Sequence, residues 1–391
     1  MQILGTRLQL HQQVQDLEHL SKYVKKLTSV PMMITKPTLL LDKQKCKRNI
    51  AMMFSKAKTN HVMFRPHFKT HQSLEIGRWF KDLGVDKITV SSLEMAQYFS
   101  KEWDDITVAF PVNILEIETI NQLAEKITLN LLVESVEATR YLAKSTKNNI
   151  GIFIKIDVGY HRTGLPPTSI QQIDEILSEI NTSSTLHFKG FLTHAGHTYS
   201  CRTKEEILAI HNTSKEILIG LKSKYIDRYP GLIISIGDTP SCSVVNDFSG
   251  IDEIRPGNFV FYDLTQQQIG ACSFNQIAVT MACPIVAIHP ERNEIVIYGG
   301  GVHFAKDRLE LDTIGTIYGI VVEQVEKGWG EPIPGMYLKS LSQEHGIVSV
   351  PEQLISNYKI GDLLYILPVH SCMTANEMKY YQSQDEIISR L

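Results

Sequence analysis

The sequence predicts an α/β protein, built as a (β/α)8 TIM barrel followed by a second, mostly β domain. From about residue 34, short β-branched runs alternate with longer segments of helical periodicity, which is typical of parallel strands joined by crossover helices. Beyond residue 270 the pattern changes to Val-, Ile- and Thr-rich runs separated by turn residues. At 391 residues the chain is long enough for both domains.

The alternating part contains eight predicted strands, which suit a closed barrel better than a doubly wound sheet. The strands lie near residues 62–64, 87–90, 106–108, 129–133, 151–156, 187–192, 232–236 and 253–254. Predicted helices fill the intervals at residues 44–58, 70–83, 93–99, 114–126, 136–146, 167–180, 204–223 and 240–248.

Domain boundaries follow from the same patterns. We expect the barrel to occupy residues 34–270 and the β domain to occupy residues 271–391. Residues 1–33 mix Gln, Asp, Glu and Lys with apolar residues, which indicates a leading amphipathic helix packed with the β domain. This composition does not match a secretory signal peptide.

Composition narrows the class of protein. Apolar residues make up 43% of the chain, charged residues 21%, and the formal net charge is −3. These values are typical of a globular protein and indicate no affinity for nucleic acid or an anionic membrane. No apolar run is long enough to span a bilayer, and six scattered cysteines without a CxxC pair predict reduced thiols. We therefore expect a cytoplasmic protein.

Polar side chains follow three of the predicted strands. The segments are Arg65–His71, Asp157–Gly164 and Thr193–Tyr199, and each is rich in His, Arg, Lys or Tyr. Because the active sites of parallel barrels lie at the carboxyl ends of the strands, we expect these segments to meet. Lys69 is one of them, and a partly desolvated lysine supplies the neutral amine that Schiff-base chemistry needs. By position alone, a solvated lysine is the commoner explanation of Lys69, and spacing does not overturn it.

A series of motifs makes this sequence resemble a known family. The series begins with Pro37-Thr38 followed by LLLD and with RPHFKTH, and continues through IDVGYHRTG, HAGHTY, GDTPS, EIRPGNFVFYD, EHG and PVHSCMTAN. In this order the motifs resemble the D-serine dehydratase and D-threonine aldolase family of alanine-racemase-like, fold-type III enzymes of pyridoxal 5′-phosphate (PLP). The resemblance spans roughly residues 35 to 385.

The resemblance implies roles for individual residues. Lys69 matches the lysine that binds PLP, and Arg162 matches the arginine directed at the cofactor ring, although a salt bridge with Asp157 would also explain it. His370 and Cys372 match the metal ligands of the dehydratase branch, and imidazole with thiolate favours zinc. The other implied cofactor-binding residues, of which the glycines and their neighbours resemble a phosphate cup, are His194, Tyr199, Gly237, Thr239, Gly257, Asn258 and Tyr262.

The implied function is a PLP- and zinc-dependent D-serine dehydratase, a lyase that forms a keto acid and ammonia, active as a homodimer. Four alternatives stay open: a D-threonine aldolase, a D-threo-3-hydroxyaspartate dehydratase, an amino-acid racemase, and a catalytically silent PLP-binding protein. Of these, the D-threo-3-hydroxyaspartate dehydratase would need only an extra cation in the substrate pocket. The β domain and the His-x-Cys pair argue against the silent protein.

Two departures from the family pattern affect the expected pocket. Leu192 stands where many relatives have a tyrosine, and GGGVHFAKD replaces a commoner D-A-G segment and introduces His303. Neutral packing in the core would also explain either change. His67 and His71 flank Lys69, where they would tune its environment or hydrogen-bond to the barrel backbone.

Overall fold

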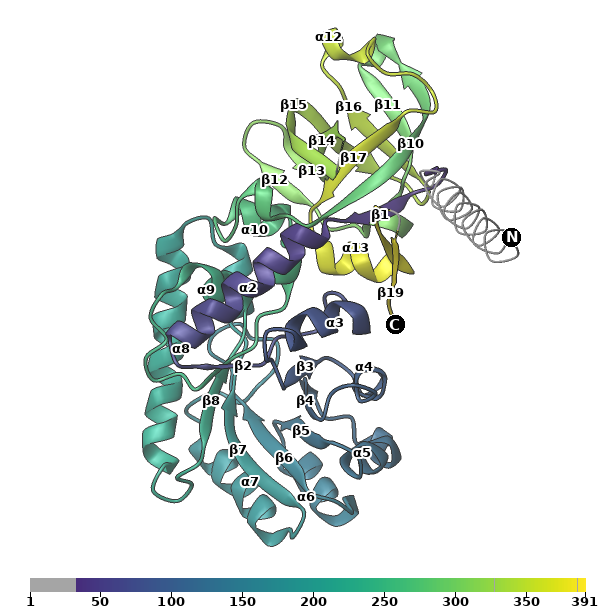
Figure 1. Cartoon of the computed structure of the whole chain (residues 1–391). Coiled ribbons are helices and arrows are strands. Elements are labelled where there is room, and N and C mark those ends of the chain that lie inside the picture. The colour runs from purple at the N-terminus through teal and green to yellow at the C-terminus, as the bar shows by residue number, and fades with distance from the viewer. Residues whose placement is uncertain (1–32, 327, 385) are drawn as a thin grey trace, which may run out of the picture.

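The structure is a computed structural model that describes residues 33–326, 328–384 and 386–391. The leading helix expected at residues 1–33 lies outside the described residues, except for Met33. Figure 1 shows two domains, with the barrel below and the β domain above it. No helix within the described ranges has the length and apolar character needed to cross a membrane.

Eight parallel strands form the barrel, in the order β2-β9-β8-β7-β6-β5-β4-β3. The bounds are β2 Met63–Phe64, β3 Ile88–Val90, β4 Asp105–Pro111, β5 Thr128–Val133, β6 Ile150–Lys155, β7 Leu186–Leu192, β8 Ile233–Ile236 and β9 Glu253–Ile254. The ring closes where the chain after β2 meets β3, since Phe68 N donates to Thr89 O at 2.8 Å and Thr89 N to Pro66 O at 2.9 Å. The barrel prediction is confirmed.

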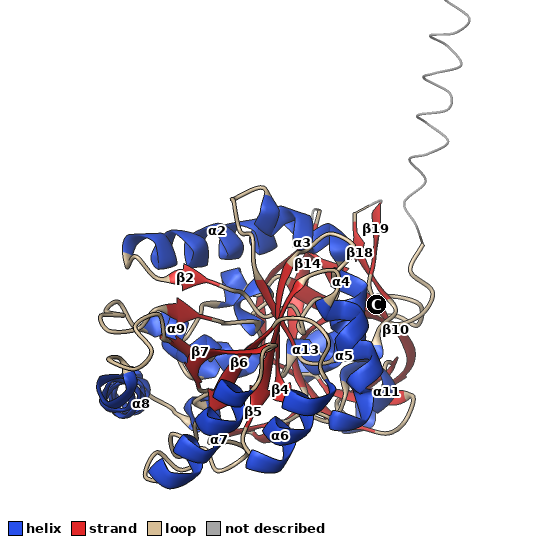
Figure 2. Ribbon diagram, turned by 90° about the horizontal axis from the view of Figure 1, so that it is seen from below, coloured by secondary structure: helices blue, strands red, loops and turns tan. Residues whose placement is uncertain are grey.

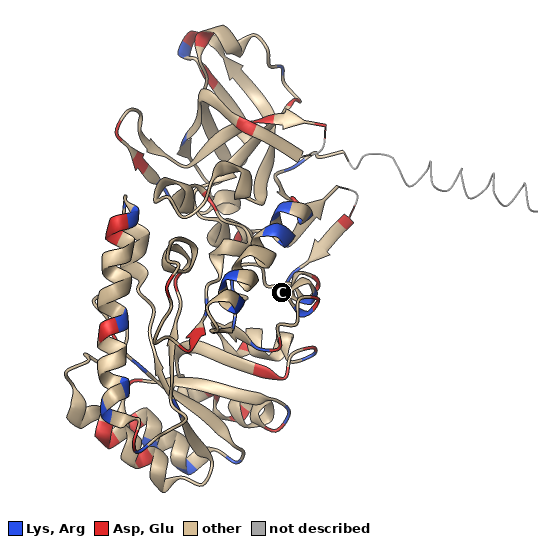
Figure 3. Cartoon of the chain, turned by 60° about the vertical axis from the view of Figure 1, so that its left-hand side comes forward, with Lys and Arg blue, Asp and Glu red and all other residues tan. Residues whose placement is uncertain are grey.

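Helices form an outer ring around these strands (Figure 2). Their bounds are α2 Lys43–Thr59, α3 Leu74–Lys81, α4 Leu93–Phe99, α5 Ile117–Ala124, α6 Val136–Ser145, α7 Ile170–Thr182, α8 Lys204–Tyr225, α9 Thr239–Val244 and α10 Leu264–Gln268, with short 3-10 turns η1 Ile114–Glu116, η2 Gly196–Ser200, η3 Asn258–Val260, η4 Phe274–Gln276 and η5 Pro290–Arg292. Hydroxyl side chains cap several of them, and Thr203 and Glu206 form a capping box at α8. Figure 3 shows acidic and basic residues interspersed over the chain.

The second domain is a nine-stranded sheet in the order β11-β16-β15-β14-β17-β10-β1-β18-β19. Its elements, together with the small hairpin β12-β13 and three short helices, are β1 Thr38–Leu41, β10 Val279–His289, β11 Glu294–Tyr298, β12 Leu309–Leu311, β13 Gly315–Ile317, β14 Gly319–Val325, β15 Gly328–Leu341, β16 His345–Ser349, β17 Leu363–Pro368, β18 Tyr380–Ser383, β19 Glu386–Ser389, α11 Gly301–Phe304, α12 Glu352–Ile355 and α13 Ser371–Glu377.

One expected boundary needs correction. We placed residues 34–270 in the barrel, but β1 pairs antiparallel with β10, with Thr38 opposite Ala282 and Leu41 opposite Val279. The run TLLL is a strand whose partner lies 240 residues later in the chain, and local pattern does not reveal such a partner. Helix α2 then leads from β1 down to the barrel (Figure 1).

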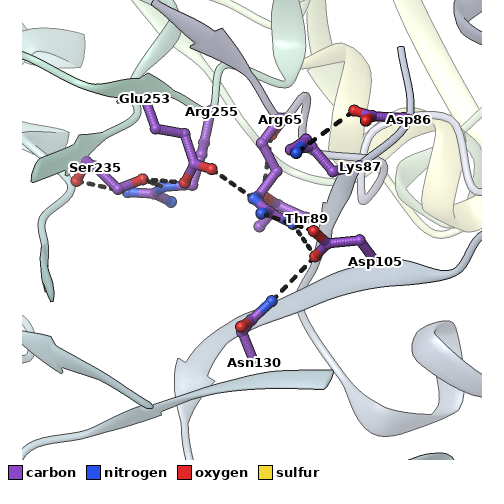
Figure 4. Close-up of polar contacts among 9 residues, drawn as sticks. All are labelled: Arg65, Asp86, Lys87, Thr89, Asp105, Asn130, Ser235, Glu253 and Arg255. Carbon is purple, nitrogen blue, oxygen red and sulfur yellow. Dashed lines mark hydrogen bonds and ion pairs between the residues drawn. The ribbon is translucent and has the colours of Figure 1, made fainter. Parts of the chain in front are cut away.

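A chain of buried polar groups crosses the barrel interior (Figure 4). Arg65 donates to Glu253 and to Asp105, both at 2.6 Å. Glu253 also accepts from Ser235 at 2.6 Å, and Ser235 accepts from Arg255 Nε at 2.6 Å. Because Glu253 is fully buried, its charge depends on Arg65 for compensation.

We predict that Arg65→Met lowers the free energy of unfolding by about 3–5 kcal/mol, because it removes the ion-pair partner of the fully buried Glu253 and leaves only the more distant charge of Arg255. Urea unfolding measures this change. The control is Arg228→Met, since Arg228 pairs with Asp174 at 2.9 Å with both side chains about half exposed. We expect that control to cost about 1 kcal/mol or less. Equal losses in the two variants would contradict the role given to Arg65.

Candidate active site

A cavity of about 570 Å³ lies at the carboxyl ends of the barrel strands and reaches the β domain. Every site residue predicted from the sequence lines it except Tyr262. These residues are Lys69, Arg162, His194, Tyr199, Gly237, Thr239, Gly257, Asn258, His370 and Cys372. Residues from five barrel segments, those after β2, β6, β7, β8 and β9, and from the β domain therefore share one space.

Tyr262 is the exception. Its hydroxyl lies 3.1 Å from Ser243 Oγ, and its ring lines a separate cavity of about 440 Å³. The next residue, Asp263, lines the main cavity instead. The turn after η3, where Tyr262 has a φ of 51°, directs these neighbours to different sides. The expected contact of Tyr262 with the cofactor is therefore not supported.

Lys69 reaches the cavity from a rigid turn after β2. His67 N donates to Pro256 O at 2.8 Å, which ties the turn to the loop after β9. The ring of Phe68 is fully buried, with its centroid 5.0 Å from that of Phe80 and 5.1 Å from that of Trp103. With Phe68 anchored in the core, the adjacent Lys69 side chain faces the opposite side and lines the cavity.

The two histidines beside Lys69 have different surroundings. His67 lines the cavity, and burial followed by the charges of Lys69 and Arg255 holds its pKa well below the usual value. Burial lowers the pKa of His71 to about 3, and His71 Nδ1 accepts a hydrogen bond from Ser73 N at 3.1 Å. Both rings are neutral. His71 is hydrogen-bonded to the backbone, which is the second of the two interpretations given for these histidines.

Arg162 sits on a loop shaped by Asp157. One Asp157 oxygen accepts from the backbone N–H groups of Gly159 and Tyr160 at 3.0 Å and of His161 at 3.1 Å. The other oxygen lies 2.9 Å from His161 Nδ1. The Arg162 guanidinium lies 5.0 Å from the centre of the Tyr160 ring, so Asp157 is engaged by the loop rather than by Arg162.

Gly237 and Gly257 bring three backbone segments close together. A Cβ on Gly237 would lie 2.9 Å from Arg255 O, and a Cβ on Gly257 would lie 2.9 Å from His67 O. Beside them, Thr239 is fully buried, and its hydroxyl has no hydrogen-bond partner among the described residues. A free hydroxyl donor on a glycine-rich cradle fits a phosphate group.

His194 and Tyr199 complete this wall. His194 Nδ1 makes a short hydrogen bond to Gly237 O, and burial followed by Lys69 holds the pKa of His194 well below its usual value. Burial raises the pKa of Tyr199. Both side chains are therefore uncharged at neutral pH and suit contact with an aromatic cofactor.

His370 and Cys372 lie at the turn from β17 into α13. Cys372 Sγ lies 3.2 Å from Thr70 Oγ1 and 3.4 Å from Asn258 Nδ2. His370 Nδ1 lies 3.3 Å from Asp307 Oδ1, which leaves Nε2 as the nitrogen for a metal. Burial opposes charge on both groups, yet Asp307 and Cys372 raise the pKa of His370, and His370 lowers that of Cys372.

The donor set fits an open metal site. Imidazole and thiolate are ligands that zinc prefers. Among the described residues no group of three or more His, Cys, Asp or Glu side chains could hold a metal. Two protein ligands are one fewer than the three of a typical catalytic zinc site, and they would leave the other positions for water or substrate.

Asp263 ties residues 369–372, the candidate metal loop, to the barrel, and it was not found from the sequence. One of its oxygens accepts from Asn258 Nδ2 at 2.6 Å and from Ser371 N at 3.0 Å. Asn258 belongs to the proposed phosphate cup, and Ser371 stands between His370 and Cys372. The only signal was its place in the quoted motif EIRPGNFVFYD.

Lys155 and Arg255 are two further cavity residues to which the sequence analysis gave no role. Arg255 Nη2 donates to Thr193 O at 2.5 Å. Lys155 ends β6 and is 5% exposed. Burial, followed by the charges of Arg255 and Arg162, lowers its pKa to about 7. A lysine within the apolar strand IGIFIK was the available signal.

We predict that Lys155 makes stability depend on pH. Between pH 7 and 10.5 the amine is neutral in the native apoprotein and protonated in the unfolded chain, so the unfolded chain holds one more proton. Native stability should therefore rise with pH by up to about 1.4 kcal/mol per pH unit relative to Lys155→Met. Urea unfolding of both apoproteins across this range measures the difference. Parallel profiles would contradict the burial of an unprotonated Lys155.

Leu192 and His303, the two departures from the family pattern, differ in whether they line the cavity. Leu192 is 1% exposed and lines the cavity. His303 does not line it, because its Nδ1 accepts from Gly300 N at 3.2 Å within α11 and its ring packs against Tyr298. Of the two, only Leu192 alters the pocket.

Comparisons with known proteins agree with this arrangement. The alanine racemase N-terminal domain matches residues 41–264, and the putative serine dehydratase domain matches residues 278–383. The chain is 31% identical to the D-serine dehydratase of Dictyostelium discoideum, over 87% of this chain and 90% of that protein. It is 26% identical to the D-threo-3-hydroxyaspartate dehydratase of Delftia sp. HT23, whose solved structure superposes with a TM-score of 0.82 over 93% of this chain and 98% of that one.

The D-threonine aldolase of Filomicrobium marinum shares the fold, with a TM-score of 0.79 over 92% of this chain and 95% of that one at 20% identity. Matches to both domain models and the identity over nearly the whole chain show the family. The chain is therefore a member of the alanine-racemase-like family that joins an alanine racemase N-terminal domain to a serine dehydratase domain.

Proposed function

We propose that the protein is a PLP- and zinc-dependent lyase that removes water from a D-3-hydroxyamino acid such as D-serine, giving a keto acid and ammonia. The observation that supports this proposal most strongly is that one cavity is lined by Lys69 and by the pair His370 and Cys372. These residues lie more than 300 positions apart in the sequence. The family is PLP-dependent, and a D-threo-3-hydroxyaspartate dehydratase mutant solved in a metal-free form implies a metal in it.

The cavity residues fit the cofactor. Lys69 would hold PLP covalently, Gly237, Gly257 and the free Thr239 hydroxyl would hold its phosphate, and Arg162 would face its ring. When bound, PLP supplies an electron sink for a bond broken at Cα. Zinc on His370 and Cys372 would supply a Lewis acid for the β-hydroxyl.

The chain's own residues then have defined tasks. With PLP bound, the substrate amine would displace Lys69, whose Nζ would then take the proton from Cα. The Cβ–O bond would break, and the hydroxide would leave as water with the proton that Lys69 Nζ took from Cα. The resulting enamine becomes an imine, and its hydrolysis gives pyruvate and ammonia from D-serine. Burial holds the pKa values of His67 and His194 well below the usual value, so both neighbouring histidines are weak bases.

A product assay tests this proposal. Purified protein loaded with PLP and zinc is incubated with D-serine, with D-threonine and, as a control, with L-serine. Keto acid and ammonia from a D-substrate, lost on chelation, support dehydration. Glycine with an aldehyde would move the protein to the aldolase reaction and overturn the proposal.

One observation favours a second candidate, racemisation. That reaction needs another acid or base beside Lys69, and Lys155 lines the same cavity with a pKa of about 7. Racemisation has no use for a metal at the β-hydroxyl, which is why we rank it second. Chiral analysis of the residual serine distinguishes the two, since only a racemase would accumulate L-serine.

We also propose the context in which the enzyme works. A division at residue 270 into a cofactor-binding and a metal-binding unit is supported by the two domain models. A cytoplasmic location is supported by six free cysteines. A homodimer is supported by the family resemblance and by exposed apolar residues such as Phe110, which lines the cavity and is 58% exposed. Light scattering tests the dimer.

A further inference from the structure

The side chain of Gln266 has an unexplained position. It is fully buried and lines the main cavity, yet neither its Nε2 nor its Oε1 has a hydrogen-bond partner among the described residues. Its backbone is fixed, because Gln266 N donates to Asp263 Oδ1 at 3.0 Å. Leaving a buried amide unpaired costs about 1–3 kcal/mol, so buried amides are normally satisfied. The free amide therefore points to a ligand in the cavity.

Arg308 lies on a segment that helix α10, which carries Gln266, contacts. Helix α10 contacts that segment through Gln268 Nε2, which donates to Glu310 O at 3.3 Å. The same helix contacts the metal loop through Thr265 Oγ1, which donates to Val369 O at 2.8 Å. On the other side, Asp307 contacts His370. Gln266 and Arg308 thus belong to segments that flank the proposed metal ligands.

The guanidinium of Arg308 is available to a ligand. Arg308 lines the cavity, and its ion pair with Glu310 is 3.6 Å long, with side chains 64% and 60% exposed. Such a pair contributes about 1 kcal/mol at most. The other two cavity arginines are engaged, since Arg255 is bound to Ser235 and Thr193 and Arg162 lies over Tyr160.

We propose that Gln266 and Arg308 form a subsite for a carboxylate on Cβ of the substrate, so that the enzyme prefers an acidic D-3-hydroxyamino acid, such as D-threo-3-hydroxyaspartate, to D-serine. The inference rests on the proposed function, which puts the β-hydroxyl at His370 and Cys372. A second substituent on Cβ then lies beside those ligands, next to Asp307 and Arg308. Arginine and amide N–H groups are suitable donors for a carboxylate.

The test compares kcat/KM for D-threo-3-hydroxyaspartate and D-serine in the holoenzyme and in two variants. Arg308→Met should lower the ratio of the two values by about 30-fold, in line with the loss of one charged hydrogen-bond partner. Lys306→Met removes the same charge two residues away from a side chain that does not line the cavity, and should change the ratio less than about 2-fold. Gln266→Leu should lower the ratio as well.

Each result has one meaning. A wild-type preference for the diacid that falls in Arg308→Met, but not in Lys306→Met, supports the subsite. Turnover of D-serine with no preference for the diacid, or an unchanged ratio in Arg308→Met, overturns the subsite and leaves the proposed function standing. Turnover of neither substrate overturns the proposed function and the subsite together.

Discussion

The Lys69→Ala protein is expected to lose lyase activity by at least about 10⁴-fold, because the change removes both the covalent link to PLP and the base for the Cα proton. The effect should lie in chemistry rather than in folding, since Lys69 makes no side-chain hydrogen bond or ion pair among the described residues. Thermal unfolding of the apoprotein should be unchanged within a degree or two.

The absorbance of the bound cofactor measures the link itself. Lys69→Ala should bind PLP only reversibly, and dialysis should remove it. The matched control is Lys155→Met, which alters the second lysine that lines the cavity and should keep the covalent cofactor. Retention of covalent PLP by Lys69→Ala would contradict the assignment.

The Cys372→Ala protein should keep its covalent PLP and lose dehydration by about 10³-fold, because a ligand of the Lewis acid is lost. Chelation of the wild-type enzyme should have the same effect, and added zinc should restore the wild type but not the variant. Competition with a chromophoric chelator measures zinc affinity directly and does not depend on activity.

The control for this change is Cys272→Ala. Cys272 is also unpaired and only partly exposed, but it lines the second cavity. We expect full zinc affinity and full activity in that variant. If Cys372→Ala bound zinc as tightly as Cys272→Ala, the metal site would lie elsewhere.

Local pattern was sufficient for the barrel. Each of the eight expected strands overlaps one of β2 to β9. Short β-branched runs between helical segments are a strong local signal for strands. Helix ends were less accurate: the helix expected from residue 70 begins at Leu74, after Ser73 caps it. The sheet that takes in β1 was missed, since strand pairing over such a distance leaves no local trace.

In the candidate site, too, the sequence predicts some residues and only the structure reveals others. Motif residues such as Lys69 and Cys372 lie together as expected, but Asp263 and Gln266 gain their interest only from contacts in three dimensions. Tyr262 is the opposite case: its motif predicts a place at the cofactor, whereas its hydroxyl lies 3.1 Å from Ser243 Oγ and the residue lines the second cavity. Which of two adjacent residues faces a cavity depends on backbone angles that the sequence does not display.

The most direct test of the account is to find which lysine carries the cofactor. Lys69 and Lys155 line one cavity, and the lowered pKa of Lys155 makes it a real competitor for the Schiff base. Borohydride reduction of the holoenzyme fixes PLP to its lysine, and peptide mapping by mass spectrometry locates it. We predict that the label lies on Lys69, in the peptide containing RPHFKTH. A label on Lys155 would contradict the assignment of Lys69 on which the proposed mechanism depends.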